Sequence, residues 1–168
     1  METAISIQTL LKRLTDGEIT PAECSDALQS LQQKHLQVGD YARLDLGRRQ
    51  RTGFPEVVYA PGKSEEELRG ILQTLIDHDR HNILVSRLTE QQYNDLVRPE
   101  VASRYYGRSS TAVFAMRPPE SGTGSVAIVT AGTSDLGIAE EAELACIHAG
   151  SSVTRFADVG IAGIDRLL

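Results

Sequence analysis

Short apolar strands alternate with amphipathic helices over most of this chain, and that alternation constrains its fold more than any other feature. Asn82–Ser86 and Val126–Thr130 are short apolar runs typical of buried strands. Leu68–Ile76 places apolar side chains at helical spacing, and a second helix is expected over Gly137–Ala149. Such alternation predicts an α/β fold with a mostly parallel sheet. Further strands are expected at Phe54–Tyr59, Ser103–Tyr106, Thr111–Met116 and Ser152–Phe156, and a further helix at Thr89–Val97.

Turn-forming and polar residues divide the chain into four segments. Residues 1–37 hold two amphipathic helices that pair as a hairpin and are separated at Asp16-Gly17. Residues 38–117 are expected to form a small α/β domain, and the proline- and glycine-rich residues 118–125 are the clearest linker. Residues 126–168 then begin a second α/β domain with a parallel sheet. The hairpin is too small to bury a core alone, so we expect it to dock on another surface.

The last segment holds fewer elements than a finished sheet of this class. It has two predicted strands and one predicted helix after Ser125. A doubly wound sheet usually has four or more strands with helices on both faces. We therefore expect that the natural protein continues past Leu168, or that a partner supplies the missing elements.

Composition and charge exclude several classes of protein. A formal net charge of -6 and a pI of about 5.2 do not suit a nucleic-acid binder. No apolar run approaches the length of a membrane span, and no signal peptide is expected at the first residues. Two cysteines cannot build a disulfide framework, and the scattered histidines show no metal-ligand spacing. We expect a soluble, cytoplasmic protein without a metal site of its own.

The strongest candidate for chemistry is the loop Thr130–Asp135, which joins the end of a predicted strand to the start of a helix. Ligands of open α/β sheets bind at that edge. Gly132 lets a ligand approach the backbone. Thr133 and Ser134 offer hydroxyl groups, and Asp135 adds a carboxylate beside helix N–H groups that favour an anion. The alternative is that Ser134 or Asp135 only caps the helix, which is the commoner use of these residues.

A second candidate loop, Asp158–Gly163, also follows a predicted strand. Its candidate ligand-binding residues are Asp158, Gly160 and Gly163. Two glycines three positions apart permit a tight turn and a close backbone approach. Their spacing is not a dinucleotide-binding fingerprint. The alternative is a plain turn between a strand and a helix.

A basic run supplies the third candidate. Arg49 and Arg51, with Lys63 beyond the next predicted strand, carry side chains that bind phosphate or carboxylate groups. Spacing alone supports equally a solvated run that pairs with the many acidic residues of the chain.

Three separated motifs, in the same order, resemble the LarB family. They are Arg49–Tyr59 with Pro61-Gly62-Lys63, Val129–Asp135 with Ala139–Ala142, and Asp158–Ile164 with Arg166-Leu167-Leu168. The resemblance extends over essentially the whole chain, which corresponds to the larger, N-terminal part of a family member.

The resemblance implies an enzyme of nickel-pincer nucleotide cofactor biosynthesis. LarB proteins carboxylate the pyridinium ring of nicotinic acid adenine dinucleotide at C5 with CO2, and they cleave its phosphoanhydride to release AMP. Their C-terminal domain is a flavodoxin-like domain similar to the aminoimidazole ribonucleotide carboxylase of purine synthesis. By resemblance, Gly132–Asp135 and the loop at Asp158–Gly163 bind the substrate and CO2, and the complete protein is a homo-oligomer, an octamer. No covalently bound cofactor is expected, and magnesium is the ion that suits the phosphates.

The family reaction also implies a group that this sequence lacks. In the family, a cysteine thiolate adds to the ring beside C5 and makes C5 nucleophilic toward CO2. By resemblance, that cysteine lies in the segment after Leu168, so Cys24 and Cys146 inherit no role and this chain alone is expected to be inactive. Asp165 stands where the family usually has histidine, and an ionised carboxylate cannot donate a hydrogen bond.

Two other functions remain open at the level of sequence. The similar domain motivates an aminoimidazole ribonucleotide carboxylase, although that enzyme does not need the domain that contains Gly53–Glu56. The missing nucleophile motivates a non-catalytic module that binds a nucleotide or assembles with a partner.

Overall fold

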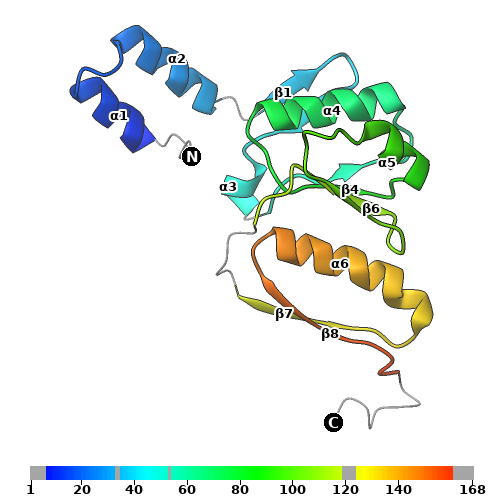
Figure 1. The fold of residues 1–168 in the computed structure, drawn as a ribbon. Coiled ribbons are helices and arrows are strands. Elements are labelled where there is room, and N and C mark those ends of the chain that lie inside the picture. Colours follow the sequence, from blue (N-terminus) through cyan, green and yellow to red (C-terminus); the bar gives the residue numbers. More distant parts are fainter. Residues whose placement is uncertain (1–6, 33–34, 53, 119–123, 161–168) are drawn as a thin grey trace.

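The computed structural model describes residues 7–32, 35–52, 54–118 and 124–160, and Figure 1 shows their arrangement. Helices and strands alternate along most of these residues, so the predicted α/β fold class is confirmed. A central sheet lies between helices on both of its faces, and a smaller parallel sheet lies beyond one of those helices (Figure 1).

The N-terminal helical hairpin consists of α1 (Ile7–Thr15) and α2 (Pro21–Gln32). Gly17, with φ 72°, adopts the left-handed conformation that ends α1. Thr20 and Glu23 form a capping box, because the Thr20 N–H donates to Glu23 Oε2 at 2.7 Å and the Glu23 N–H donates to Thr20 Oγ1 at 3.2 Å. The bonds from the Thr20 backbone and hydroxyl hold the pKa of Glu23 below its usual value. Local sequence signals therefore set both ends of this turn.

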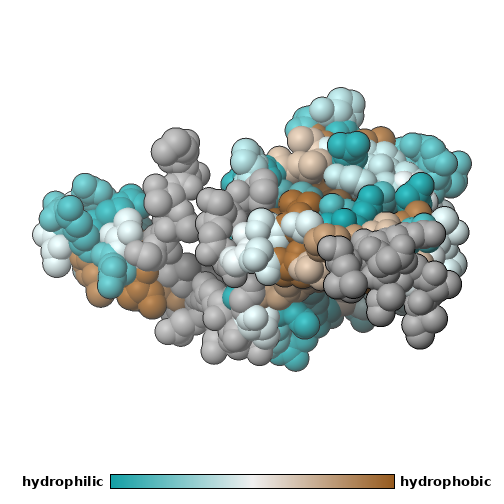
Figure 2. Space-filling model, turned by 90° about the horizontal axis from the view of Figure 1, so that it is seen from below, coloured by the Kyte–Doolittle hydropathy of each residue, from teal (hydrophilic) through white to brown (hydrophobic). Residues whose placement is uncertain are grey.

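The hairpin keeps part of its apolar surface exposed. Its two helices pack on each other and stand to one side of the sheets (Figure 1). Leu10 and Cys24 are buried, whereas Ile7 and Leu11 remain exposed, and Figure 2 shows apolar surface on this part of the molecule. The surface on which we expect the hairpin to dock is not found among the described residues.

Residues 35–52 form elements that the sequence pattern did not predict. β1 (His35–Val38) and β2 (Ala42–Asp45) pair as an antiparallel hairpin, and α3 (Arg48–Thr52) follows. Gly39, with φ 53°, makes the turn. Tyr41 then lies against α4, since a Cβ added to Gly70 would stand 2.1 Å from the Tyr41 hydroxyl oxygen.

The central sheet is mixed, which corrects the prediction of a mostly parallel one. Its strand order is β3 (Val58–Tyr59), β4 (Ile83–Ser86), β6 (Thr111–Phe114) and β5 (Arg104–Tyr106). β3 and β4 are parallel, but β6 is antiparallel to both of its neighbours. The turn between β5 and β6 is too short for the crossover that parallel strands require. The strand expected at Phe54–Tyr59 is limited to its last two residues.

Two capped helices cover one face of this sheet. Ser64 with Glu67 begins α4 (Glu65–Asp77), and Thr89 with Gln92 begins α5 (Glu90–Leu96), each through a capping box. The buried side of α4 consists of Leu68, Ile71, Leu72 and Leu75. Each of these side chains contributes about 1.5–3 kcal/mol by its burial, and together they are four of the fourteen buried residues of this core cluster.

The opposite face of the central sheet is covered by α6 (Leu136–His148). Leu144 is 5% exposed and packs with Leu84 of β4 and Val113 of β6. At the start of α6, Glu140 Oε2 accepts the Ser109 N–H at 2.9 Å. A Cβ added to Gly137 would stand 2.8 Å from the Arg108 carbonyl oxygen, so the helix approaches the β5–β6 turn closely.

The smaller sheet pairs β7 (Ser125–Val129) with β8 (Ser152–Phe156) in parallel, as predicted. The expectation that Val126–Thr130 is a buried strand is wrong for this structure, because alternate positions of β7 are exposed. Of the described helices, α6 is the one that packs on the pair, and Val129 is 54% exposed on the open face. Figure 2, which views the molecule from the side of this sheet, shows apolar surface there. The helix expected at Ile164–Leu168 lies outside the described residues.

Candidate functional site

Two predicted ligand loops lie side by side at the carboxyl ends of β7 and β8. The Thr130 N–H donates to the Phe156 carbonyl at 2.9 Å, and the Val159 N–H donates to the Thr130 carbonyl at 3.1 Å. A Cβ added to Gly160 would lie 3.3 Å from the Ala131 carbonyl oxygen. The structure therefore brings the loop after β7 against the loop after β8, at the edge where α/β sheets bind ligands.

The first loop makes a single 3₁₀ turn, η1 (Thr133–Asp135), before α6 begins. Asp135 Oδ2 accepts the Gly132 N–H at 3.1 Å, and the Ser134 hydroxyl donates to Asp135 Oδ1 at 3.3 Å. The carboxylate thus holds the loop in shape. The side chains of Thr133 and Ser134 are exposed, so their hydroxyl groups face solvent at this edge.

Part of the capping alternative is found at η1, where Asp135 accepts the N–H of the N-cap residue Gly132. Asp135 stands at the N-cap of α6 but makes no side-chain capping bond to the helix, and the first turn of α6 holds no acidic residue. The Leu136 N–H donates to the Thr133 carbonyl, so the 3₁₀ turn already satisfies the first donor of α6. Ser134 bonds to Asp135 rather than to the helix.

The second loop is shaped by its backbone. Asp158 has φ 61°, in the left-handed region, and Gly160 follows it. Between the loops, the hydroxyl oxygen of Thr130 is buried and has no hydrogen-bond partner within the described residues. Gly163, the last candidate of this loop, lies outside them.

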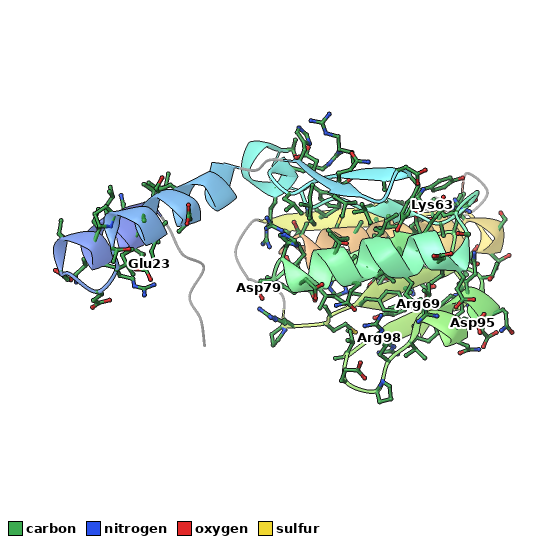
Figure 3. The ribbon with its side chains drawn as sticks, turned by 90° about the horizontal axis from the view of Figure 1, so that it is seen from above. Glu23, Lys63, Arg69, Asp79, Asp95 and Arg98 are labelled. Atoms are coloured by element: carbon green, nitrogen blue, oxygen red, sulfur yellow. The ribbon has the colours of Figure 1, made fainter. Side chains whose placement is uncertain are left out.

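The three basic candidates do not gather at one place. Lys63 Nζ donates to the Tyr59 carbonyl at 2.8 Å, near the start of α4. Arg49 lines a pocket that also includes Asp79, at the opposite end of α4. Figure 3 shows Lys63 and Asp79 at the two ends of that helix, whose 13 residues span roughly 20 Å at 1.5 Å per residue. The Arg51 side chain lies outside what the structure describes.

The pocket beside Arg49 contains residues that the sequence did not single out. Arg80 and His81 line it, from the loop that joins α4 to β4. Asp79 and Asn82, on either side of them, adopt φ 53° and φ 52°. Asp and Asn tolerate this conformation better than other residues with a side chain, so their presence around Arg80-His81 was the available signal.

Neither cysteine lies near the loops of β7 and β8. Cys24 is buried in the helical hairpin. Cys146 lies in α6, roughly 16 Å along the helix axis from Asp135 at a rise of 1.5 Å per residue. Within the described residues, no group of three or more His, Cys, Asp or Glu side chains is placed to hold a metal ion, and no helix has the length and apolarity needed to cross a membrane.

The fold therefore places this chain among the α/β proteins with open sheets. Such proteins commonly bind ligands at the carboxyl ends of parallel strands, which is where the two loops of this chain meet. Residues 35–117, from β1 to the end of the central domain, match the family described as the LarB/PurE-like N-terminal domain. Residues 35–117 thus have a LarB/PurE-like N-terminal domain, and the resemblance to the LarB family is confirmed for this part of the chain. The domain also relates the chain to carboxylases.

A curated relative extends this similarity beyond the central domain. An uncharacterized protein of Methanocaldococcus jannaschii is 31% identical over 169 residues, which cover 96% of this chain and 64% of the relative. The chain thus spans about 64% of the length of that protein. Similarity along nearly all of the chain includes the loops of β7 and β8.

Proposed function

We propose that the complete protein is a cytoplasmic pyridinium carboxylase/hydrolase of nickel-pincer nucleotide cofactor biosynthesis. Nicotinic acid adenine dinucleotide, CO2 and water give pyridinium-3,5-biscarboxylic acid mononucleotide and AMP. The observation that carries the proposal is the adjacency of the loops after β7 and β8, in a chain whose central domain is LarB/PurE-like.

The proposed chemistry requires groups that bind CO2 and stabilise a carboxylate. A pyridinium ring is electron-poor, so a thiolate first adds beside C5 and makes C5 nucleophilic. C5 then attacks CO2, a base removes the C5 proton, and the thiolate leaves with its electron pair. Water cleaves the phosphoanhydride. We propose that residues after Leu168 supply the thiolate, since Cys24 is buried in the hairpin and Cys146 lies along α6.

The described loops are suited to the CO2 and carboxylate part of this reaction. The exposed hydroxyl groups of Thr133 and Ser134 are donors that would stabilise negative charge developing on oxygen, and Ser134 would turn from Asp135 to do so. Gly132 leaves room at the backbone for a flat ring, since nothing lies within 4 Å of a Cβ added to it. Asp135 acts through Gly132, whose N–H it accepts, and is a positioning residue.

The test is an assay of the full-length protein with nicotinic acid adenine dinucleotide and bicarbonate, in which chromatography with mass spectrometry measures AMP and the biscarboxylic mononucleotide. Thr133→Val combined with Ser134→Ala should lower the rate by about 100-fold, as for lost oxyanion donors. Thr154→Val, at an exposed position of β8, should leave it unchanged. Absence of both products from the folded wild-type protein would refute the proposal.

The same assay separates the alternative functions. Carboxylation of aminoimidazole ribonucleotide, without AMP release from the dinucleotide, would assign the purine-pathway reaction that the related carboxylase domain motivates. Calorimetric binding of the dinucleotide without turnover would assign a non-catalytic binding module.

We also propose that the complete protein is a symmetric homo-oligomer, an octamer by the family resemblance, and that magnesium binds with the phosphates of the substrate. Light scattering after size exclusion measures the mass of the assembly. Addition of a chelator to the assay tests magnesium, because phosphate oxygens are ligands that this ion prefers.

A further inference from the structure

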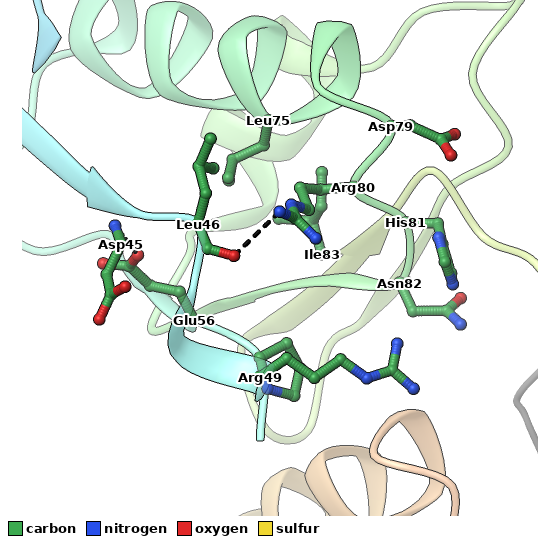
Figure 4. Close-up of a pocket in the computed structure, with 11 residues that line it drawn as sticks. Asp45, Leu46, Arg49, Glu56, Leu75, Asp79, Arg80, His81, Asn82 and Ile83 are labelled. Atoms are coloured by element: carbon green, nitrogen blue, oxygen red, sulfur yellow. Dashed lines mark hydrogen bonds between the residues drawn. The ribbon is translucent and has the colours of Figure 1, made fainter. Parts of the chain in front are cut away.

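A pocket of about 60 Å³ lies at the end of α4, where β2, α3 and the loop before β4 meet (Figure 4). This volume holds a few water molecules or one small polar group. Its walls combine apolar side chains, such as Leu75 and Ile83, with Arg49, Arg80 and His81. The loops of β7 and β8 contribute no lining residue, so the pocket is separate from the proposed carboxylase site.

The Arg80 guanidinium lacks an anionic partner in the described part of the chain. Its Nη2 donates to the Leu46 carbonyl at 2.9 Å (Figure 4). Its Nε is buried and has no hydrogen-bond partner among the described residues, and none of their carboxylates forms an ion pair with it. Arg80 is half-buried, and a buried N–H donor of a guanidinium without an acceptor is unfavourable, because buried polar and charged groups are normally paired.

His81 provides a second buried polar atom without a partner. Its Nδ1 is buried and makes no hydrogen bond to a described residue. The backbone next to it is fixed, since the Asn82 N–H donates to the Ala115 carbonyl at 3.0 Å and Asn82 Oδ1 accepts the Arg117 N–H at 2.9 Å. These bonds fix the loop that carries His81 beside the pocket.

The acidic residues of the pocket are separated from these basic groups. Glu56 Oε2 accepts the Asp45 N–H at 2.6 Å, which commits one carboxylate oxygen to the backbone. Figure 4 shows Asp45 and Glu56 on one side of Arg80, and Arg49 with His81 on the other. A guest on the second side meets two guanidinium groups and an imidazole.

The carbonyl groups at the C-terminal end of α4 and the Asp79 carboxylate are bonded elsewhere and do not point at a bound anion. The Leu75 and Ile76 carbonyls accept the N–H groups of Arg80 and Asp79, so they are already bonded. Asp79 Oδ1 forms an ion pair with Arg117 Nη2 at 2.8 Å, and its side chain points away from Arg80 (Figure 4).

We propose that this pocket of the LarB/PurE-like domain binds a small oxyanion, a phosphate or a carboxylate group, through Arg80, Arg49 and His81. Guanidinium groups bind such anions by paired, charge-assisted hydrogen bonds. The guest would accept from Arg80 Nε and would supply the missing counter-charge. The proposal is independent of the carboxylase reaction, because it concerns binding without turnover.

The test is calorimetry of the full-length protein with inorganic phosphate, sodium acetate, AMP and adenosine, each alone. We expect saturable one-site binding of phosphate or acetate below about 10 mM. Preference for phosphate and AMP would identify a phosphate group as the guest, and preference for acetate would identify a carboxylate. Adenosine bound as tightly as AMP would overturn the proposal, since recognition would then lie in the base.

Variants separate this site from nonspecific attraction. Arg80→Gln and Arg49→Gln should each weaken binding by about 10-fold or more, as expected when a charge-assisted bond is lost. Arg43→Gln, at an exposed position of β2, should bind like the wild type. Arg80→Gln also loses the bond to Leu46, so thermal unfolding establishes that each variant is folded, and Arg49→Gln repeats the test without that bond. Unchanged affinity in both folded variants, or no saturation, would refute the site.

Discussion

The central sheet and the β7–β8 sheet have strands of similar apolar composition but different burial. Every residue of β4 and β6 is buried, because α4 and α5 cover one face of the central sheet and α6 covers the other. β7 alternates between exposed and half-buried positions, since α6 is the one described helix that packs on it. An apolar run therefore predicts a strand, but the number of sheet faces that helices cover decides how much of that strand is buried.

The helix α6 contributes to both sheets, so it offers the sharpest tests of this difference. Its side chains toward the central sheet should matter for stability, and its open positions should not.

Leu144→Ala should lower the free energy of unfolding by about 2–5 kcal/mol, through lost burial and a cavity between α6 and the central sheet. Leu144 is 5% exposed there. Ile138→Ala is the matched control on the same helix, where the side chain is 65% exposed, and its effect should stay within about 0.5 kcal/mol. Urea denaturation measures both. Equal losses would mean that α6 does not dock as described.

Gly137→Ala should destabilise the protein by about 1–3 kcal/mol, although alanine is the better helix former by up to 1 kcal/mol. The added Cβ would stand 2.8 Å from the Arg108 carbonyl oxygen, and backbone cannot move as easily as a side chain end. Gly132→Ala, where nothing lies within 4 Å of the added atom, is the control for thermal unfolding. A more stable Gly137→Ala protein would contradict the close approach.

The free energy of unfolding should decrease as the pH falls below about 6.5 through His148. Burial holds the pKa of His148 below 6.5 in the folded protein, so the unfolded chain takes up the proton first and is favoured. This contribution is present above pH 6.5 and is lost as the pH falls toward the lower, folded pKa. His148→Leu should flatten the profile measured by urea denaturation at several pH values, and His78→Gln, at an exposed position, should not.

Val129→Thr, on the open face of the β7–β8 sheet, should change the free energy of unfolding by no more than about 0.5 kcal/mol. Val129 is 54% exposed, and threonine keeps the β-branched shape. The same change at Val113, which is fully buried in β6, should cost about 1–3 kcal/mol, because it buries a hydroxyl. A large loss at Val129 would show that its face is covered in the folded protein.

Local signals explain most of what the sequence predicted. Ser64 with Glu67 and Thr89 with Gln92 begin helices through bonds three residues apart, and such spacing is visible in a sequence. The β1–β2 hairpin was missed although Gly39-Asp40 between alternating apolar residues is a turn signal. Its strands are short and half-exposed, so their composition resembled a loop.

Contacts distant in sequence explain what was not predicted. The antiparallel place of β6 depends on pairing with β4 across the sheet, which strand composition does not record. The pocket depends on Arg80 reaching the Leu46 carbonyl, 34 positions earlier. The loop at Thr130–Asp135 was predicted as a unit because strand, glycine and helix follow one another directly, and its roles in binding stay predictions.

The position of α6 between the two sheets has a consequence for cooperativity. The β7–β8 sheet has no other described helix, and the central sheet loses the cover of one face if α6 departs. Separation of α6 from either sheet would therefore destabilise the other sheet as well. The two sheets should unfold in a single cooperative transition. A molecule that tightens the loop at the start of α6 would then protect amide hydrogens of β4 and β6 from exchange, although it touches neither strand.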